Sequence, residues 1–148
     1  MLPTDILDQT GISLNYPATS KKRVLEEAAR LLARTDDQPD AEQIYERLME
    51  RERLGSTGLA NGVALPHARM PGVEAASGAF LRLAEPVDFD ALDGKPVDLV
   101  FSLLVPEEAT QEHLDLLAGL ARLFGDPQLC ERLRQTKNPS EALELLAG

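Results

Sequence analysis

Two early segments show the spacing of three and four positions that places apolar residues on one side of a helix. The first follows Thr19 or Ser20, either of which can cap a helix. Its apolar stripe consists of Leu25, Ala28, Ala29 and Leu32. The second follows Asp40, with Gln43 three residues later, as in a capping box. We therefore expect two amphipathic helices, the second ending near residues 54–55.

Three short apolar segments in the middle of the chain are typical of strands. The run at 63–65 should end immediately before His67, because Pro66 has no N–H to donate to a neighbouring strand. Residues 78–83 and 98–105 form longer runs. The latter is apolar at nearly every position, which predicts a central strand covered on both faces.

Helical signals return after these strands. A leucine-rich helix is expected from about residue 110 to 124, and its leucines lie around most of its circumference, which predicts a largely buried helix. These are Leu114, Leu116, Leu117, Leu120 and Leu123. Two more helices open at Asp126–Pro127 and Asn138–Pro139. The pattern predicts one α/β domain over residues 1–148, a small mixed β-sheet sandwiched between helices, with residues 1–15 as an extended arm.

The composition and net charge of the chain make some classes of binding partner unfavourable. The chain has 148 residues, 43% of them hydrophobic, and a net charge of −10, so phosphate backbones and anionic lipid are poor partners. Its one cysteine, Cys130, cannot form a disulfide within the chain. No stretch of consecutive apolar residues approaches the ~18 that a membrane-spanning helix needs. The N-terminus lacks both the basic region and the apolar region of an export signal. We expect a cytoplasmic protein without nucleic-acid binding or direct membrane insertion.

The two histidines, His67 and His113, are the candidates for nucleophilic or acid–base chemistry near neutral pH. His67 follows a strand and a proline, and the glycine-rich segment 55–62 lets other groups approach closely. His113 lies in the first turn of the leucine-rich helix, where the helix dipole favours neutral imidazole. Each histidine also has a purely structural interpretation. His67 could be a surface histidine in a turn, and His113 could be a half-buried residue that hydrogen-bonds a loop carbonyl.

The sequence lacks several other signatures. Segment 55–62 is neither a P-loop nor a G-x-G-x-x-G fingerprint. The chain contains no HExxH zinc motif and no G-x-S-x-G elbow. Asp88, Asp90 and Asp93 lack the glutamate that closes a calcium loop, so we interpret them as a solvated turn. No cofactor and no metal are expected.

One local preference is violated at the start of the first helix. Lys21, Lys22 and Arg23 occupy its first turn, where a positive charge opposes the macrodipole at a cost of about 0.3–1 kcal/mol each. This cluster is either a contact surface for an anion or a solvated basic patch.

The segment STGLANGVALPHAR (56–69) resembles the active-site signature of the fructose/mannitol type of enzyme IIA from the bacterial phosphoenolpyruvate-dependent phosphotransferase system. Similar segments follow the family's order along nearly the whole chain, at 19–29, 50–58, 89–107 and 112–124. The stretch ALDGKPVDLVF followed by LLVP is most similar to the nitrogen-related branch, which regulates and does not feed a sugar permease.

The resemblance implies an α/β phosphotransferase that relays a phosphoryl group between proteins. It implies that His67 accepts the group from a histidine phosphocarrier protein, that His113 hydrogen-bonds it, and that Arg51 stabilises its charge. It also implies regulatory targets such as a sensor kinase or a potassium transporter, and signalling through the phosphorylation state in nitrogen or potassium regulation.

Three alternatives stay open. The chain could be a regulatory binding module of the same fold that is not phosphorylated, a sugar-specific enzyme IIA that passes phosphate to an enzyme IIB, or a hydrolase that pairs His67 with a carboxylate such as Asp93.

The chain departs from the family pattern at Ala60 and Ala68, where glycine is usual. A positive φ at position 60 would cost alanine about 1 kcal/mol or more. Arg69 adds positive charge close to His67.

Overall fold

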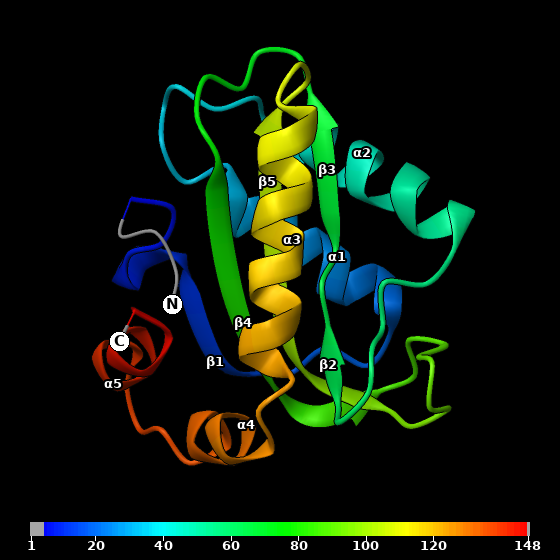
Figure 1. Cartoon of the computed structure of the whole chain (residues 1–148), viewed down its shortest axis with the longest axis vertical. Coiled ribbons are helices and arrows are strands. Elements are labelled where there is room, and N and C mark those ends of the chain that lie inside the picture. Colours follow the sequence, from blue (N-terminus) through cyan, green and yellow to red (C-terminus); the bar gives the residue numbers. More distant parts are fainter. Residues whose placement is uncertain (1–4, 148) are drawn as a thin grey trace.

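A mixed β-sheet forms the middle layer of the computed structural model, which describes residues 5–147 (Figure 1). Strands β4 and β5 pair antiparallel, β1 pairs parallel with β4, and both β2 and β3 pair parallel with β5. In order across the sheet, the strands are β1 (Ile12–Tyr16), β4 (Ser77–Val87), β5 (Val97–Pro106) and β2 (Val63–Ala64), with β3 (His67–Met70) also beside β5. The predicted mixed sheet is confirmed.

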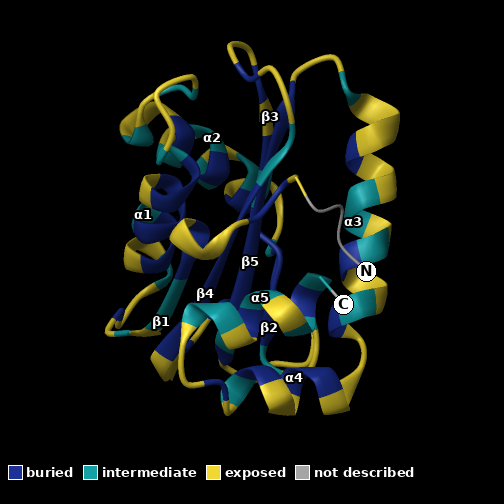
Figure 2. Cartoon of the chain, turned by 90° about the vertical axis from the view of Figure 1, so that its left-hand side faces the viewer, coloured by how far each residue is buried: buried dark blue, intermediate teal, exposed yellow. Residues whose placement is uncertain are grey.

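Helices cover both faces of this sheet (Figure 2). Helices α1 (Lys21–Leu32) and α2 (Ala41–Leu54) share one hydrophobic core with the sheet. The opposite core contains residues of α3 (Thr110–Phe124), α4 (Pro127–Arg134) and α5 (Pro139–Ala147). A short 3₁₀ turn, Gln9–Gly11, precedes β1. The predicted α/β class, with a small sheet between helices, is therefore confirmed.

The first two helices begin at the capping residues that the sequence indicated. The Ser20 hydroxyl accepts a hydrogen bond from the Arg23 N–H at 3.2 Å, and the Asp40 carboxylate accepts one from the Gln43 N–H at 2.9 Å. Each bond satisfies an N–H that has no partner within its own helix.

Strand β5 is the central strand, as predicted. Val100 and Leu104 belong to the core under α1 and α2, whereas Leu99 and Leu103 belong to the opposite core, and all four are buried. This alternation explains why the segment is apolar at nearly every position.

The N-terminal stretch differs from the expected extended arm. Residues 12–16 form β1, an edge strand in which Ile12 pairs with Phe80 and is buried. Its period-two pattern of Ile12, Leu14 and Tyr16 is only five residues long, and polar neighbours conceal it in the sequence. Residues 1–4 of the predicted arm lie outside the described residues.

The strand expected at 63–65 ends before His67, as predicted, but a second strand that the sequence did not indicate, β3, begins at His67. Val63 pairs with Leu99 and His67 pairs with Leu103, so the register against β5 is the same on both sides of the interruption. Pro66 donates no hydrogen bond, but its carbonyl accepts one from the Leu103 N–H at 3.0 Å. Proline therefore interrupts the ladder locally, and β3 continues beyond it.

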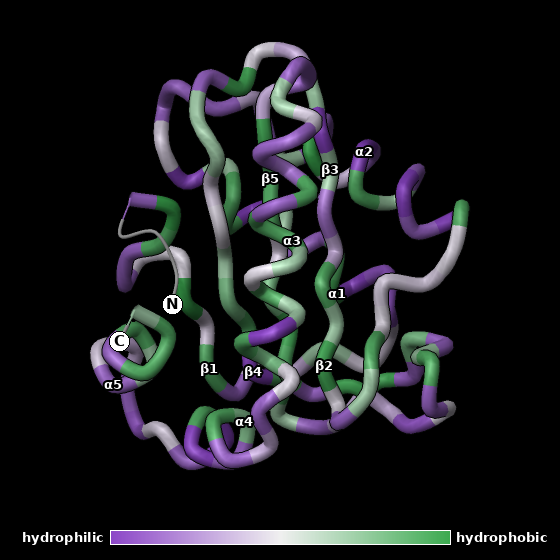
Figure 3. Tube along the Cα trace, in the orientation of Figure 1, coloured by the Kyte–Doolittle hydropathy of each residue, from purple (hydrophilic) through white to green (hydrophobic). Residues whose placement is uncertain are grey.

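Helix α3 is less buried than its leucines predicted. Its buried residues are His113, Leu120 and Phe124, whereas Leu114 is 62% exposed. Figure 3 shows hydrophilic and hydrophobic residues interleaved along this helix. The reason is that the N-terminal half of α3, including Leu117, borders a pocket instead of packing closely on the sheet.

Candidate functional site

The register of β3 determines which of its side chains face α3. Because side chains alternate along a strand, His67 and Arg69 lie on the same face as Val63 and Leu65, which belong to the α3 core. Ala68 points the other way and packs in the core under α1 and α2. Strand β3 lies at the edge of the sheet, so His67 meets residues from both α2 and α3.

The ring of His67 is held by the carbonyl of Leu65, in the two-residue link between β2 and β3. Its Nδ1 atom lies 2.7 Å from the backbone oxygen of Leu65. A carbonyl oxygen can only accept, so Nδ1 carries the proton and the lone pair resides on Nε2. Burial is the largest influence on the ring and lowers the pKa of His67, which favours neutral imidazole. A neutral ring with a free Nε2 is a competent nucleophile.

His113 lies beside this ring. The centroids of the two imidazoles are 5.0 Å apart, and their planes meet at 76°. His113 is 8% exposed, and its Nε2 atom is buried without a hydrogen-bond partner among the described residues. Burial, followed by the nearby His67, lowers the pKa of His113 to about 4. The expected neutral form is therefore favoured, but burial contributes first and not the helix dipole.

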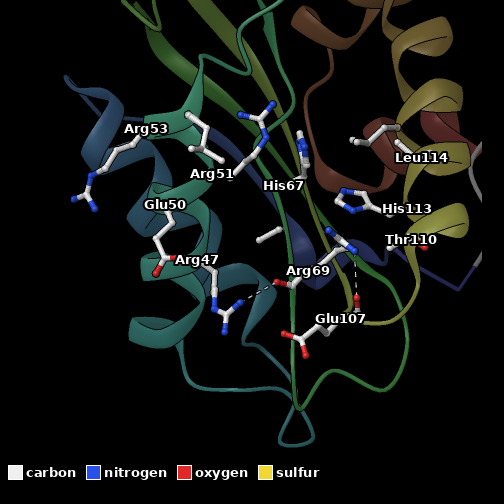
Figure 4. Close-up of a pocket in the computed structure, with 13 residues that line it drawn as sticks. Arg47, Glu50, Arg51, Arg53, His67, Arg69, Glu107, Thr110, His113 and Leu114 are labelled. Carbon is white, nitrogen blue, oxygen red and sulfur yellow. Dashed lines mark hydrogen bonds between the residues drawn. The ribbon is translucent and has the colours of Figure 1, made fainter.

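Both histidines line one pocket of about 820 Å³ between the end of α2 and the start of α3 (Figure 4). Four arginines and only two glutamates line it, in a chain whose net charge is −10. The lining residues are Arg47, Glu50, Arg51, Arg53, Leu54, His67, Ala68, Arg69, Glu107, Thr110, His113, Leu114 and Leu117. A local excess of guanidinium groups favours an anionic ligand such as a phosphoryl group.

The arginines do not all point the same way. Figure 4 shows the guanidinium groups of Arg51 and Arg69 near the two imidazoles, whereas Arg53 points away from them. Arg51 donates to the carbonyl of Gly55 at 2.9 Å, and Arg69 donates to the carbonyl of Glu107 at 3.4 Å. These bonds leave further N–H groups of each fork to contact an anion.

The N-terminus of α3 adds a second kind of positive charge. Ala109 occupies the capping position and makes no side-chain bond to the first turn. Thr110, the first residue of the helix, lines the pocket. The Thr110 N–H donates to the Glu108 carbonyl at 3.0 Å, so the contribution of this turn is the positive end of the helix dipole, which favours a negative ligand there.

The glycine-rich loop adopts its special backbone conformations at positions other than Ala60. Within the described residues, the positive φ angles of this loop belong to Asn61 (62°) and Gly62 (79°). Alanine at position 60 therefore does not incur the anticipated strain. Ala68 lies in β3 and needs no glycine either.

The structure brings together His67, His113, Arg51 and Arg69, but it does not add Asp93. That carboxylate accepts hydrogen bonds from the N–H groups of Lys95 at 3.0 Å and Asn61 at 3.2 Å, and it does not line the pocket. The pairing of His67 with Asp93 that a hydrolase would need is not formed.

Sequence reasoning missed Arg47 and the carbonyl of Leu65. Arg47 lies four residues before Arg51, a spacing that places both on one side of a helix, and this signal could have been used. The Leu65 carbonyl has no sequence signal, because a backbone acceptor depends only on the path of the chain.

In residues 5–147, no group of three or more His, Cys, Asp or Glu side chains could hold a metal ion. None of the described helices is long and apolar enough to cross a membrane.

Known proteins share this sequence and fold. A nitrogen regulatory protein from Pseudomonas aeruginosa is 52% identical over 130 residues, which cover 88% of this chain and 84% of that relative. The crystal structure of the nitrogen regulatory protein IIA-Ntr from Neisseria meningitidis matches with a TM-score of 0.91 and 48% identity over 97% of both chains. Mannitol enzyme IIA from Escherichia coli, solved in complex with phosphorylated enzyme IIB, matches with a TM-score of 0.80 and 25% identity over 96% of this chain and 97% of that one.

The family itself follows from a match along almost the whole chain. The family model described as phosphoenolpyruvate-dependent sugar phosphotransferase system, EIIA 2, matches residues 5–148. This range includes the histidine pocket and all the strands and helices described above. The chain therefore belongs to the EIIA 2 family of the phosphoenolpyruvate-dependent sugar phosphotransferase system, and its similar relatives include nitrogen regulatory proteins.

Proposed function

We propose that this protein accepts a phosphoryl group on Nε2 of His67 from a histidine phosphocarrier protein and regulates its targets through its phosphorylation state. One observation carries the proposal. The Leu65 carbonyl fixes Nδ1 of His67 as the protonated nitrogen, which leaves the Nε2 lone pair free in a pocket lined by four arginines. Donor and acceptor are both protein side chains, so the reaction requires no cofactor.

The transfer is a displacement at phosphorus. The Nε2 lone pair of His67 forms a new bond to phosphorus while the bond from phosphorus to the donor's histidine nitrogen breaks, and that nitrogen recovers the electron pair. Positive charge develops on the His67 ring as the bond forms. The Nδ1–H that is donated to Leu65 at 2.7 Å stabilises this charge and holds the ring in the attacking orientation.

The phosphoryl oxygens need donors around them, because phosphoryl transfer depends mainly on positioning and on stabilising these oxygens. Arg51 and Arg69 supply guanidinium N–H groups from two sides. His113 supplies a hydrogen bond from its otherwise unpartnered Nε2 when that atom carries the proton. The start of α3, which borders the pocket, adds the positive end of its helix dipole.

The similarity to nitrogen regulatory proteins, at 52% and 48% identity, supports a regulatory output. A sensor kinase or a potassium transporter is the kind of target that this resemblance suggests. A second candidate is onward transfer to an enzyme IIB, favoured by the shared fold with the mannitol enzyme IIA that was solved with its phosphorylated enzyme IIB.

The direct test is incubation with phosphoenolpyruvate, enzyme I and a histidine phosphocarrier protein, followed by intact mass spectrometry. We expect one acid-labile, alkali-stable addition of about 80 Da, the mass of a phosphoryl group on a nucleophilic side chain. His67→Ala should abolish it and leave thermal stability nearly unchanged, because the ring is only partly buried. Complete labelling of His67→Ala would refute the assignment, and no labelling of the wild type would favour the unphosphorylated binding module.

A further inference from the structure

A buried carboxylate outside the pocket holds the hairpin that leads to His67. The side chain of Glu52, the residue after Arg51, is 2% exposed. Its Oε2 accepts a hydrogen bond from the Thr57 N–H at 2.9 Å, and its Oε1 accepts one from the Thr57 hydroxyl at 2.6 Å. Charged acceptors make stronger hydrogen bonds than neutral ones, so this contact fixes Thr57 firmly.

The charge of Glu52 is balanced from α1. Lys21 Nζ lies 2.9 Å from Glu52 Oε2 and 5.1 Å from the centroid of the Phe89 ring. A buried carboxylate without such a partner would be costly. This ion pair explains why a lysine occupies the first turn of α1 despite the unfavourable helix dipole.

Two hydrogen bonds connect Thr57 to the ring of His67. The Leu65 N–H donates to the Thr57 carbonyl at 3.0 Å, and the Leu65 carbonyl accepts from His67 Nδ1 at 2.7 Å. Around this path, Gly58 and Ala64 form an antiparallel bridge. Residues 57–65 are therefore a small hairpin, with one side bound to Glu52 and the other bound to the nucleophile.

We propose that Lys21, Glu52 and Thr57 act as a positioning device that orients the ring of His67 through the backbone of Leu65. The proposal rests on the proposed function of His67 as the phosphoryl acceptor. The device touches neither donor nor phosphoryl group, so its residues are positioning residues. They keep the proton on Nδ1 and Nε2 in line for attack. Misplacement of a reacting atom by about 1 Å can slow a reaction by roughly 100-fold.

The test uses two variants and two controls. Thr57→Val keeps the size of the side chain and removes the hydroxyl, and Glu52→Gln removes the charge and leaves one acceptor for the two donors of Thr57. Thr57→Ser restores the hydroxyl. Thr136→Val is the matched control, because Thr136 is also buried and hydrogen-bonded through its hydroxyl, but to Arg82 and Leu133 outside the pocket.

Two readouts are measured on each folded variant. The first is the tautomer of His67, from long-range ¹H–¹⁵N spectra of the imidazoles without any partner protein. The second is the rate of phosphorylation by the relay. We expect Thr57→Val and Glu52→Gln to gain a population with the proton on Nε2 and to be phosphorylated roughly 10- to 100-fold more slowly. Thr57→Ser and Thr136→Val should behave like the wild type.

The two proposals fail in different ways. A wild-type protein that is never phosphorylated refutes the proposed function, whereas the tautomer spectra still measure whether the device orients His67. An unchanged tautomer and rate in both Thr57→Val and Glu52→Gln overturns the positioning proposal. The positioning proposal is also overturned if Thr136→Val, at equal thermal stability, alters the tautomer and the rate as strongly. If Thr57→Val does not fold, the proposal is decided by Glu52→Gln, compared with Thr57→Ser: equal tautomer populations and rates in these two variants overturn it.

Discussion

The ring of His113 meets the ring of His67 nearly edge-on, with 5.0 Å between centroids and 76° between planes. The two residues are 46 positions apart in the sequence, and α3 and β3 bring them together. Both rings have a pKa below the usual value, so both favour the neutral state near neutral pH. Of the two rings, that of His67 has its Nδ1 on the Leu65 carbonyl, which supports the proposed assignment of His67 as nucleophile and of His113 as hydrogen-bond donor.

His113→Ala should slow phosphorylation by roughly 10- to 1000-fold, the range for losing one oriented electrostatic donor. The product should still be phospho-His67, because the Leu65 carbonyl still fixes the tautomer of the nucleophile. Single-turnover labelling followed by peptide mapping measures both the rate and the site. A label that moves to another residue, or a His67→Ala variant labelled on His113, would require the two roles to be exchanged.

Arg51→Ala should slow transfer within the same range, roughly 10- to 1000-fold, because its guanidinium lies beside His67 in the pocket and can bind two phosphoryl oxygens. Arg122→Ala is the matched control. It removes the same charge from the chain, but from an exposed position in the last turn of α3. Equal rates for the two variants would show that overall charge, and not the position of Arg51, determines the effect.

Acid should destabilise the protein through His113. Its pKa in the folded state is lowered to about 4 from the ordinary value of 6.5, so the unfolded chain takes up this proton first. The stabilisation is complete above pH about 6.5 and is lost as pH falls towards 4, by up to about 3 kcal/mol at 1.36 kcal/mol per pKa unit. His67, whose pKa is also lowered, contributes in the same direction.

Urea unfolding at pH about 7.5 and about 4.5 measures this effect. Carboxylates also lose stabilising contacts in acid, so the informative quantity is the difference between the wild type and His113→Asn. The variant should lose less stability than the wild type between the two pH values. An identical loss would mean that His113 is not protonated differently in the folded and unfolded chains.

The backbone of the glycine-rich loop predicts that two reverse exchanges, Ala60→Gly and Gly62→Ala, both destabilise the protein. Ala60→Gly should lower the free energy of unfolding by about 0.4–1 kcal/mol, because Ala60 has no positive φ and glycine adds freedom to the unfolded chain. Gly62→Ala should lower it by about 1 kcal/mol or more. Gly62 has a φ of 79°, and a Cβ there would lie 2.7 Å from the Arg134 guanidinium and 2.8 Å from the Asp98 carboxylate. Denaturant unfolding of both variants tests the pair, and a more stable Ala60→Gly would contradict it.

Local patterns predicted much of the fold because each depends on neighbours in sequence. The Ser20 and Asp40 caps, the central strand β5 and the helices that open with proline follow rules that operate within a few residues. The resemblance, not spacing, singled out His113 and Arg51 as partners of His67.

The remaining features depend on contacts between distant segments. The edge strand β1 is stabilised by β4, and its period-two pattern of five residues is too short to indicate a strand without that partner. The burial of α3 depends on the pocket beneath its first turns, which helical periodicity cannot show. The ion pair of Lys21 with Glu52 joins two helices, so Lys21 looked unfavourable when α1 was considered alone.

Phosphorylation should act as a change of surface charge with little change in fold. A phosphoryl group adds about −1.5 to −2 charges. On a protein of net charge −10, this weakens docking to acidic surfaces and strengthens docking to basic ones. A target would then prefer one form by about 1–3 kcal/mol. The start of α3 borders the pocket, and the bond from Arg51 to the Gly55 carbonyl links the pocket to the glycine-rich loop, so both segments should tighten when the anion is present.

Hydrogen exchange on the free and phosphorylated proteins measures this change. Protection should rise around residues 55–70 and 108–114, and strand β5 should be unaffected because its core residues are already buried without the phosphoryl group. His67→Ala, treated with the same relay, is the control and should show no rise. Changes spread across the sheet, or none in the two segments, would mean that targets do not recognise the phosphorylated form through a local charge at His67. The restricted pattern would direct the search for targets to surfaces that contact α2 and the start of α3.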